Sequence, residues 1–225
     1  MDLTRAIDSY CERVDPSFWG EPVNAVTNLA FIFAALVMWR RVWGQGMVLA
    51  EGLTWVLGAI GVGSFLFHTK AQAWAAIADT VPILVFVLIY IYAANRHYWR
   101  LGRWPALGGT VLFFPFAAAT VPLFQMIPGA GSSAGYGPVP LLIAIYAVLL
   151  RRRLPEVAKG LGVGAGVLVL SLIFRSLDLP LCARFPLGTH FLWHITNAVM
   201  LSWMIEVLRR YLIREGRCRS AKASV

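Results

Sequence analysis

The chain consists mostly of long apolar stretches separated by short polar segments. Each stretch is close to the length that a helix needs to cross a bilayer, although the fifth and sixth are shorter. Inside a bilayer the backbone must satisfy its own hydrogen bonds, so such stretches indicate helices. The pattern therefore predicts an all-α membrane protein with a bundle of seven transmembrane helices. The expected spans are 23–39, 47–68, 74–94, 105–124, 139–150, 161–174 and 186–207.

The composition also favours a membrane protein. Hydrophobic residues make up 59% of the 225 residues and charged residues only 14%. The mean hydropathy of +0.68 is far above that of an ordinary soluble domain. The net charge of +9 could indicate nucleic-acid binding, but the basic residues are grouped in loops between the apolar stretches. This grouping is typical of membrane topology, so we expect a lipid bilayer and no nucleic acid as partner, with no protein partner evident.

The distribution of basic residues predicts the orientation of the chain. Most of the 20 Lys and Arg residues fall in three of the connecting loops or after the last span. Cytoplasmic loops carry the excess of these residues, so we expect the C-terminus in the cytoplasm. Seven spans then place the N-terminus outside. The expected regions are an acidic arm outside the membrane at 1–22, a seven-helix transmembrane domain at 23–209 and a basic cytoplasmic tail at 210–225.

Two histidines stand out at the start of the last span. His190 and His194 are four residues apart, so on a helix they lie one turn apart on the same face. The surrounding stretch is apolar, and an ionisable group inside a membrane usually has a partner and a function. Two histidines at this spacing can supply part of a zinc site.

The predicted topology brings further candidates to the same side of the membrane. The second span ends outside at His68, with Ser64 one turn before it, and the third span carries Asp79 in its first turns. His190 and His194 lie in the outer half as well. Three histidines would give zinc three protein ligands and leave a fourth position for water, as in catalytic zinc sites. We therefore expect His68, His190 and His194 to bind Zn²⁺.

Each of these residues also has a purely structural explanation. The histidines could form hydrogen bonds between helices, and Asp79 could pair with a cation such as Lys70. The fourth histidine, His97, lies in a basic loop on the opposite side, so we expect no metal role for it. The metal site is favoured because all of its members are predicted at one depth.

The same residues indicate a type of chemistry. The glutamate of a His-Glu-x-x-His motif is absent, because Phe191 follows His190, so a general base must come from another helix. Asp79 is the only acidic residue that we expect well inside a span on the outer side, and it could take the proton of an attacking water. Ser64 could donate a hydrogen bond to the oxyanion that forms on a carbonyl. These residues predict metal-assisted hydrolysis of a substrate that lies in lipid with its polar head at the interface.

Four motifs together point to a known family. They are Glu21-Pro-Val-Asn24-Ala-Val-Thr-Asn28, Ser64-x-x-x-His68, Asp79 and His190-x-x-x-His194. With them the chain resembles the alkaline ceramidases, especially their bacterial relatives. The resemblance implies a seven-helix zinc hydrolase that cleaves the linear amide of ceramide, or of a related N-acyl lipid, to a long-chain base and a fatty acid. It implies that the three histidines bind Zn²⁺, that Asp79 is the base and that Ser64 stabilises the oxyanion. A bacterial member would lie in the inner membrane with this site in the outer half.

The resemblance also implies a role for the N-terminal arm. In the alkaline ceramidases this arm binds calcium, and clustered carboxylates and carbonyls suit that ion. Glu12 and Glu21 match the family best, Tyr10 offers a backbone carbonyl, and Asp8 or Asp15 could substitute for a ligand that this chain lacks. Taken alone, the arm could equally be a solvated acidic segment.

Cysteines occur on both expected sides of the membrane. Cys11 and Cys182 are expected outside, whereas Cys218 lies in the expected cytoplasmic tail. An oxidising exterior allows either a disulfide or free thiols. The family resemblance supports a Cys11–Cys182 pairing, which would join the arm to the loop before the last span.

Two other classes of function fit part of the pattern. The Ser, His and Asp motifs are shared with adiponectin-type receptors, so a receptor or signalling protein could keep zinc for structure. A proton-coupled transporter could use Asp79 and the histidines as a proton relay. Against a transporter, the sequence has no internal repeat and no pair of broken helices. A hydrolase is the function that the sequence favours.

Overall fold

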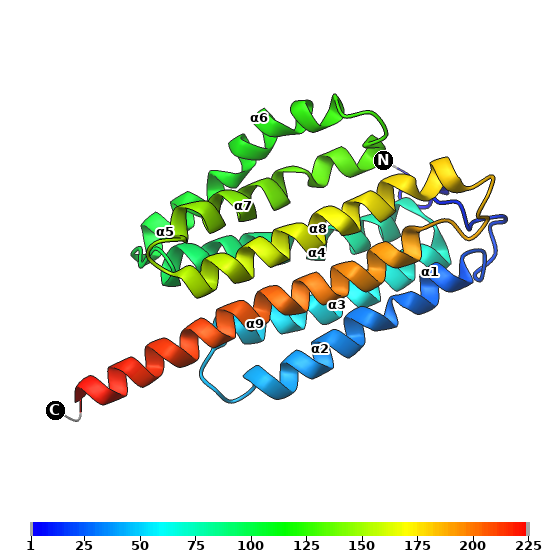
Figure 1. Cartoon of the computed structure of the whole chain (residues 1–225). Helices are drawn as coiled ribbons and strands as arrows, with labels where there is room; N and C mark the ends of the chain where they lie inside the picture. Colours follow the sequence, from blue (N-terminus) through cyan, green and yellow to red (C-terminus); the bar gives the residue numbers. More distant parts are fainter. Residues whose placement is uncertain (1, 224–225) are drawn as a thin grey trace.

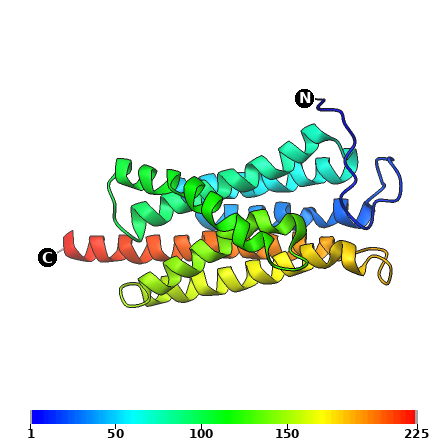
Figure 2. The same cartoon turned by 90° about the horizontal axis from the view of Figure 1, so that it is seen from above.

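The structure is a computed structural model that describes residues 2–223, and the side chains of all of these except 132 and 217–223. Seven helical segments of the described chain are long and apolar enough to cross a membrane, which confirms the predicted fold class. They lie side by side in a single bundle (Figures 1 and 2).

The helices follow the predicted apolar stretches, and most of them are longer. Their bounds are α1 Pro22–Thr27, α2 Leu29–Val42, α3 Val48–Lys70, α4 Ala73–His97, α5 Arg103–Val111, α6 Phe113–Gln125, the 3₁₀ helix η1 Gly131–Tyr136, α7 Pro138–Leu150, α8 Pro155–Leu181 and α9 His190–Ala223. The largest difference is α8, which we expected only over 161–174. Backbone hydrogen bonding continues past single charged residues such as Lys159 and Arg175, where an apolar pattern stops.

The last span begins and ends later than expected. We expected it to start at residue 186, but α9 begins at His190 and residues 186–189 form the turn before it. The helix passes residue 207 and continues to Ala223. The backbone of the expected tail, 210–225, is therefore a continuation of α9 as far as the structure describes it. The side chain of Cys218 lies outside the described residues.

Two of the spans consist of two α-helices each, although we expected no pair of broken helices. The fourth is interrupted at Leu112, between α5 and α6. Pro115 follows shortly after and has no N–H to donate to the preceding turn, so the hydrogen-bond ladder cannot run through this point. The first span is interrupted at Asn28, between α1 and α2, where the Asn28 side chain donates to the Asn24 carbonyl at 2.8 Å.

The last helix occupies the centre of the bundle. α9 packs against α1, α2, α3, α4 and α8, whereas α5 contacts α4 and α6 contacts η1 and α7. Figure 1 shows α6 at the edge of the bundle and α9 between α8 and α2. Residues at the start of α9 can therefore meet residues from several other helices.

The N-terminal arm is packed against one end of the bundle, which we call the arm end. Ile7 donates to the carbonyl of Ala71 at 2.7 Å, so the arm crosses the turn between α3 and α4. Farther along, the predicted disulfide joins Cys11 to Cys182, directly after α8. Figures 1 and 2 show the arm and the α8–α9 loop together at this end, away from the end of α9. Which side of a membrane the arm end meets stays a prediction.

Helices α3 and α4 approach each other closely near the arm end. A Cβ atom built on Gly63 would lie only 2.0 Å from the carbonyl oxygen of Ala78, the residue before Asp79. A glycine is therefore required for α4 to pack this close to α3. The contact matters for the site because Ser64 follows Gly63 directly.

We predict that Gly63→Ala destabilises the protein. The added methyl group must push α4 away, and such overpacking costs roughly 1–3 kcal/mol. Gly52→Ala is the matched control in the same helix, because a Cβ there meets nothing within 4 Å. Thermal unfolding of the purified protein in detergent should show a lower Tm for Gly63→Ala and an unchanged or higher Tm for Gly52→Ala. Equal Tm values for Gly63→Ala and the wild type would contradict the close approach.

Candidate metal centre

Three histidines from two helices meet at the arm end. His68 lies in the last turn of α3, and His190 and His194 lie in the first two turns of α9. Their ring centroids are 4.7–5.1 Å apart, and one potential ligand nitrogen from each lies within 4.8 Å of the others. The three residues are only 0–2% exposed. The structure thus brings together the three histidines that we expected to bind zinc.

Each of the three rings has a buried nitrogen without a hydrogen-bond partner. These atoms are Nε2 of His68, Nδ1 of His190 and Nε2 of His194. A buried polar atom without a partner costs free energy, and one such atom in each of three adjacent rings needs a common explanation. A metal ion supplies it, because imidazole nitrogens are preferred ligands of zinc.

In two of the rings, a hydrogen bond to one nitrogen determines that the other nitrogen is left to bind a metal. Nδ1 of His68 lies 2.5 Å from Oε2 of Glu21. An ionised carboxylate only accepts hydrogen bonds, so Nδ1 carries the proton and Nε2 keeps its lone pair. The Thr27 hydroxyl donates to the Val23 carbonyl at 2.8 Å and so accepts from Nδ1 of His194 at 2.9 Å. Both rings therefore have the tautomer that a metal ligand requires, and these residues fit a zinc ion.

A buried aspartate that the sequence analysis missed positions the start of α9. Asp178 accepts hydrogen bonds from the backbone N–H groups of Thr189 at 2.8 Å and His190 at 2.9 Å. These are N–H groups at the start of α9, which have no partner within the helix. The other carboxylate oxygen of Asp178 accepts from the N–H of Cys11 at 2.9 Å. One side chain thus fixes both α9 and the arm.

We expected Asp79 to be the only acidic residue well inside a span on the outer side, but Asp178 is also buried within a span at the arm end. The predicted sixth span stopped at residue 174, whereas α8 continues to Leu181 and includes Asp178. The usual signal for such a cap is an Asp or Ser directly before the helix. Here the capping residue comes from the preceding helix, so the local sequence of α9 gives no sign of it.

The arm covers one ring of the metal centre. The Tyr10 ring is stacked on the His190 ring, with centroids 3.7 Å apart and an interplanar angle of 23°. The disulfide at the neighbouring Cys11 holds the arm in this place. Tyr10 was expected to offer its carbonyl to calcium, but its side chain is what contacts the site.

Ser64 and Asp79 lie beside the histidines. Ser64 is buried one turn before His68 on α3, and its side chain is within hydrogen-bonding reach of the Asp79 carboxylate on α4. Lys70, the alternative partner that we considered for Asp79, has its ammonium over the ring of Phe18. The site thus contains a carboxylate and a hydroxyl next to the candidate metal ligands.

Arg175 of α8 adds a positive charge on the same side. Its guanidinium lies over the rings of Tyr136 and Trp193 and donates to the Ser133 hydroxyl at 3.2 Å. Its positive charge lies within electrostatic range of the Asp79 carboxylate. The predicted sixth span ended at residue 174, directly before Arg175, because the apolar stretch stops at this charged residue.

Comparison with known proteins identifies the family. The family model described as Ceramidase matches residues 6–221. The chain belongs to the ceramidase family. No curated protein matches the chain. Membership covers nearly the whole chain and supports a ceramide-type hydrolase, an amidohydrolase, as the resemblance implied.

The residues that this family resemblance suggested for calcium have other partners. Both carboxylate oxygens of Glu12 accept backbone N–H groups at the start of α1, from Val23 at 2.6 Å and Asn24 at 2.7 Å. The Tyr10 carbonyl accepts the N–H of Arg13 at 3.3 Å, and Asp8 is exposed. In this arrangement the Glu12 and Tyr10 oxygens are already satisfied by N–H groups of the chain, Asp8 lies apart at the surface, and they do not form a calcium site without rearrangement.

Glu21 is likewise engaged, and its environment favours the ionised form. Oε1 lies 2.5 Å from Nε of Arg13, and Oε2 lies 2.5 Å from Nδ1 of His68. Burial alone would raise the pKa of Glu21, but its hydrogen bonds to His68 and Arg13 and the positive charge of Arg13 hold that pKa below its ordinary value. Within the described residues, the three histidines are the one group of three or more His, Cys, Asp or Glu that could hold a metal ion.

We predict that the purified protein binds about one zinc ion per chain, as expected for a three-histidine site. Replacing any of His68, His190 or His194 by Ala removes a ligand and should empty the site in elemental analysis. His97→Ala is the matched control, because His97 ends α4 away from the arm end. Zinc content that is unchanged in all three ligand variants would refute the assignment.

Proposed function

We propose that the protein is a zinc-dependent hydrolase that cleaves the amide of ceramide, or of a related N-acyl lipid, within the membrane. The observation that carries the proposal is the group of three buried histidines with unpaired nitrogens beside Ser64 and Asp79. When bound, zinc would supply a Lewis acid to the reaction. The family match to ceramidases favours hydrolysis over the receptor and transporter alternatives.

Asp79 is proposed as the general base. Its carboxylate can accept the proton of a water that attacks the amide carbonyl and can then donate it to the nitrogen that leaves as the amine. Ser64 is proposed to donate its hydroxyl hydrogen to the oxyanion that forms on the carbonyl carbon. The position of both residues beside His68 supports this assignment.

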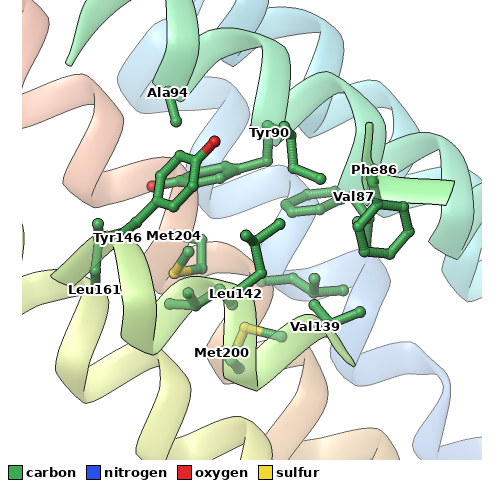
Figure 3. Close-up of a pocket in the computed structure, with 14 residues that line it drawn as sticks. Phe86, Val87, Tyr90, Ala94, Val139, Leu142, Tyr146, Leu161, Met200 and Met204 are labelled. Carbon is green, nitrogen blue, oxygen red and sulfur yellow. The ribbon is translucent and has the colours of Figure 1, made fainter. Parts of the chain in front are cut away.

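An apolar pocket deeper in the bundle supports a lipid substrate (Figure 3). Figure 3 shows Tyr90, Tyr146 and Met200 among the side chains that line it. Each tyrosine hydroxyl already hydrogen-bonds a neighbouring polar side chain, at 3.1 and 2.8 Å, so the pocket suits hydrocarbon. Met200 lies roughly 9 Å beyond His194 along α9, at about 1.5 Å per residue. An acyl chain whose amide lies at the metal centre is long enough to span this distance.

The location in the cell is part of the same proposal. We propose a bacterial inner membrane, with the arm end in the outer half and the end of α9 in the cytoplasm. The disulfide at the arm end supports this orientation, because disulfides persist in oxidising surroundings. The basic residues Arg151, Arg152 and Arg210 lie toward the opposite end, which agrees with the excess of positive charge in cytoplasmic loops.

Mass spectrometry of a panel of N-acyl lipids incubated with the purified protein tests this function. We predict release of a fatty acid and a long-chain base from ceramide or a close relative. Asp79→Asn should nearly abolish turnover while retaining zinc, because it removes the base and leaves the three ligands. If the wild-type protein holds zinc and cleaves none of the lipids, the proposed function is wrong. Full activity of Asp79→Asn would remove only Asp79 from the mechanism.

We further predict that Ser64→Ala lowers kcat by on the order of 10²-fold, the effect of removing one oxyanion donor. KM should change little, because the hydroxyl is proposed to act mainly in the transition state. Ser202→Ala, a serine farther along α9, is the control and should behave as wild type. A Ser64→Ala enzyme with wild-type kcat would show that the hydroxyl has no such role.

A further inference from the structure

The N-terminal arm contains a buried arginine, Arg13, that contacts the candidate ligand His68 and its hydrogen-bond partner Glu21. The side chain of Arg13 is 4% exposed. Three of its nitrogens have different acceptors: Nε lies 2.5 Å from Glu21, Nη2 donates to the His68 carbonyl at 2.9 Å and Nη1 donates to the Asp15 carbonyl at 3.1 Å. A guanidinium can hold three acceptors at once because its donors form a rigid planar fork.

The glycine at position 20 leaves space for the Arg13 guanidinium. A Cβ atom on Gly20 would lie 2.9 Å from Nη1 of Arg13 and 2.5 Å from the Asp15 carbonyl oxygen. Any side chain at position 20 would therefore disturb the arginine or its acceptor. The neighbouring arginine of the same arm, Arg5, is exposed. Of the two arginines in the arm, only Arg13 is therefore buried.

Through Glu21 this arginine is connected to a candidate zinc ligand. Glu21 is 3% exposed and bridges Arg13 to Nδ1 of His68. A buried carboxylate is costly unless a cation and hydrogen bonds compensate it. The Glu21 carboxylate in turn fixes the orientation of the His68 ring, which determines where its free Nε2 points.

A second contact ties Arg13 to the backbone of the same ligand. The carbonyl of His68 lies in the last turn of α3, where carbonyls lack partners within the helix. A cation is also favoured there by the helix dipole. Arg13 therefore holds His68 at both its ring, through Glu21, and its backbone.

We propose that Arg13 is the positioning residue of the metal centre and takes the place that the family resemblance suggested for calcium. The acidic side chains expected to share a calcium ion are satisfied without one, Glu12 by backbone N–H groups and Glu21 by Arg13. The cation that neutralises Glu21 belongs to the chain itself. Zinc binding in this protein then depends on Arg13 and is independent of calcium. This inference rests on the proposed zinc centre.

Zinc affinity measured by chelator competition on the full-length protein tests the proposal, with no lipid substrate present. Arg13→Gln should raise the Kd for zinc about 10- to 100-fold, the usual effect of losing an outer hydrogen-bond partner of a ligand. Arg13→Lys should restore part of the affinity, because it keeps the charge and loses the fork. Arg5→Gln removes the same charge from an exposed position and should bind zinc as the wild type does. Adding calcium in excess to the wild type should leave the Kd unchanged.

A combination of variants separates positioning from general stability. If Arg13 acts through Glu21, Arg13→Gln should weaken zinc binding much less in a Glu21→Gln background than alone. The Tm of the metal-free proteins is measured alongside. A lower metal-free Tm in Arg13→Gln with an unchanged zinc Kd would show a structural role only and overturn the proposal. If Arg13→Gln does not fold, Arg13→Lys compared with Arg5→Gln decides in the same way.

Two further outcomes are decisive. If calcium tightens zinc binding in the wild type, the arm binds that ion and Arg13 does not replace it. If the wild type binds zinc and Arg13→Gln binds it equally tightly, this proposal fails and the proposed function stands. A wild-type protein that binds no zinc would refute the proposed function and this proposal together.

Discussion

The buried nitrogens of the three histidines constrain the whole arm end of the molecule. A ring nitrogen buried between membrane helices is shielded from bulk water, so it needs a partner from the protein or a bound ion. Glu21 and Thr27 satisfy one nitrogen each on His68 and His194. Each ring has a buried nitrogen without a hydrogen-bond partner, and each offers one potential ligand nitrogen within 4.8 Å of the others, close enough for a single cation. A metal ion is therefore the simplest reason for three polar rings to be buried side by side.

Meeting this requirement depends on parts of the chain that are far apart in sequence. The ligands come from α3 and α9, and the residues that orient them come from the arm and from α1. Asp178 in α8 holds the start of α9 and the backbone of Cys11 with one carboxylate. The arm thus belongs to the metal centre structurally, since it provides Glu21, Arg13 and the ring of Tyr10.

Membership in the ceramidase family gives this centre its chemical context. An amide in the middle of a lipid must be cleaved where its chains can stay in an apolar environment. The metal centre lies at one end of the bundle, and the apolar pocket of Figure 3 lies deeper, between helices that include α4, α7 and α9. Ser64 and Asp79 lie beside the histidines, and in the proposed function the head group of the lipid lies there. The arrangement suits a substrate that enters with its chains in the membrane.

The sequence by itself determined the local features of this protein. Apolar runs predict seven helices because a bilayer leaves the backbone no other way to satisfy its hydrogen bonds. The i, i+4 spacing of His190 and His194, and of Ser64 and His68, places each pair on one helix face. The direction of each span was then enough to predict that these residues lie at the same depth in the membrane.

Only the tertiary structure decided how these residues are held. Asp178 caps a helix that begins 12 residues later, and Arg13 reaches a carbonyl 55 residues away. Neither contact leaves a local pattern, because both depend on how the α8–α9 loop and the arm fold back onto the bundle. The same holds for the calcium donors: the sequence shows carboxylates in the arm, but whether they accept N–H groups, a guanidinium or an ion depends on what packs beside them. Hydrophobic periodicity determines which segments are helices, whereas the partner of each buried polar group is determined by the packing of the whole chain.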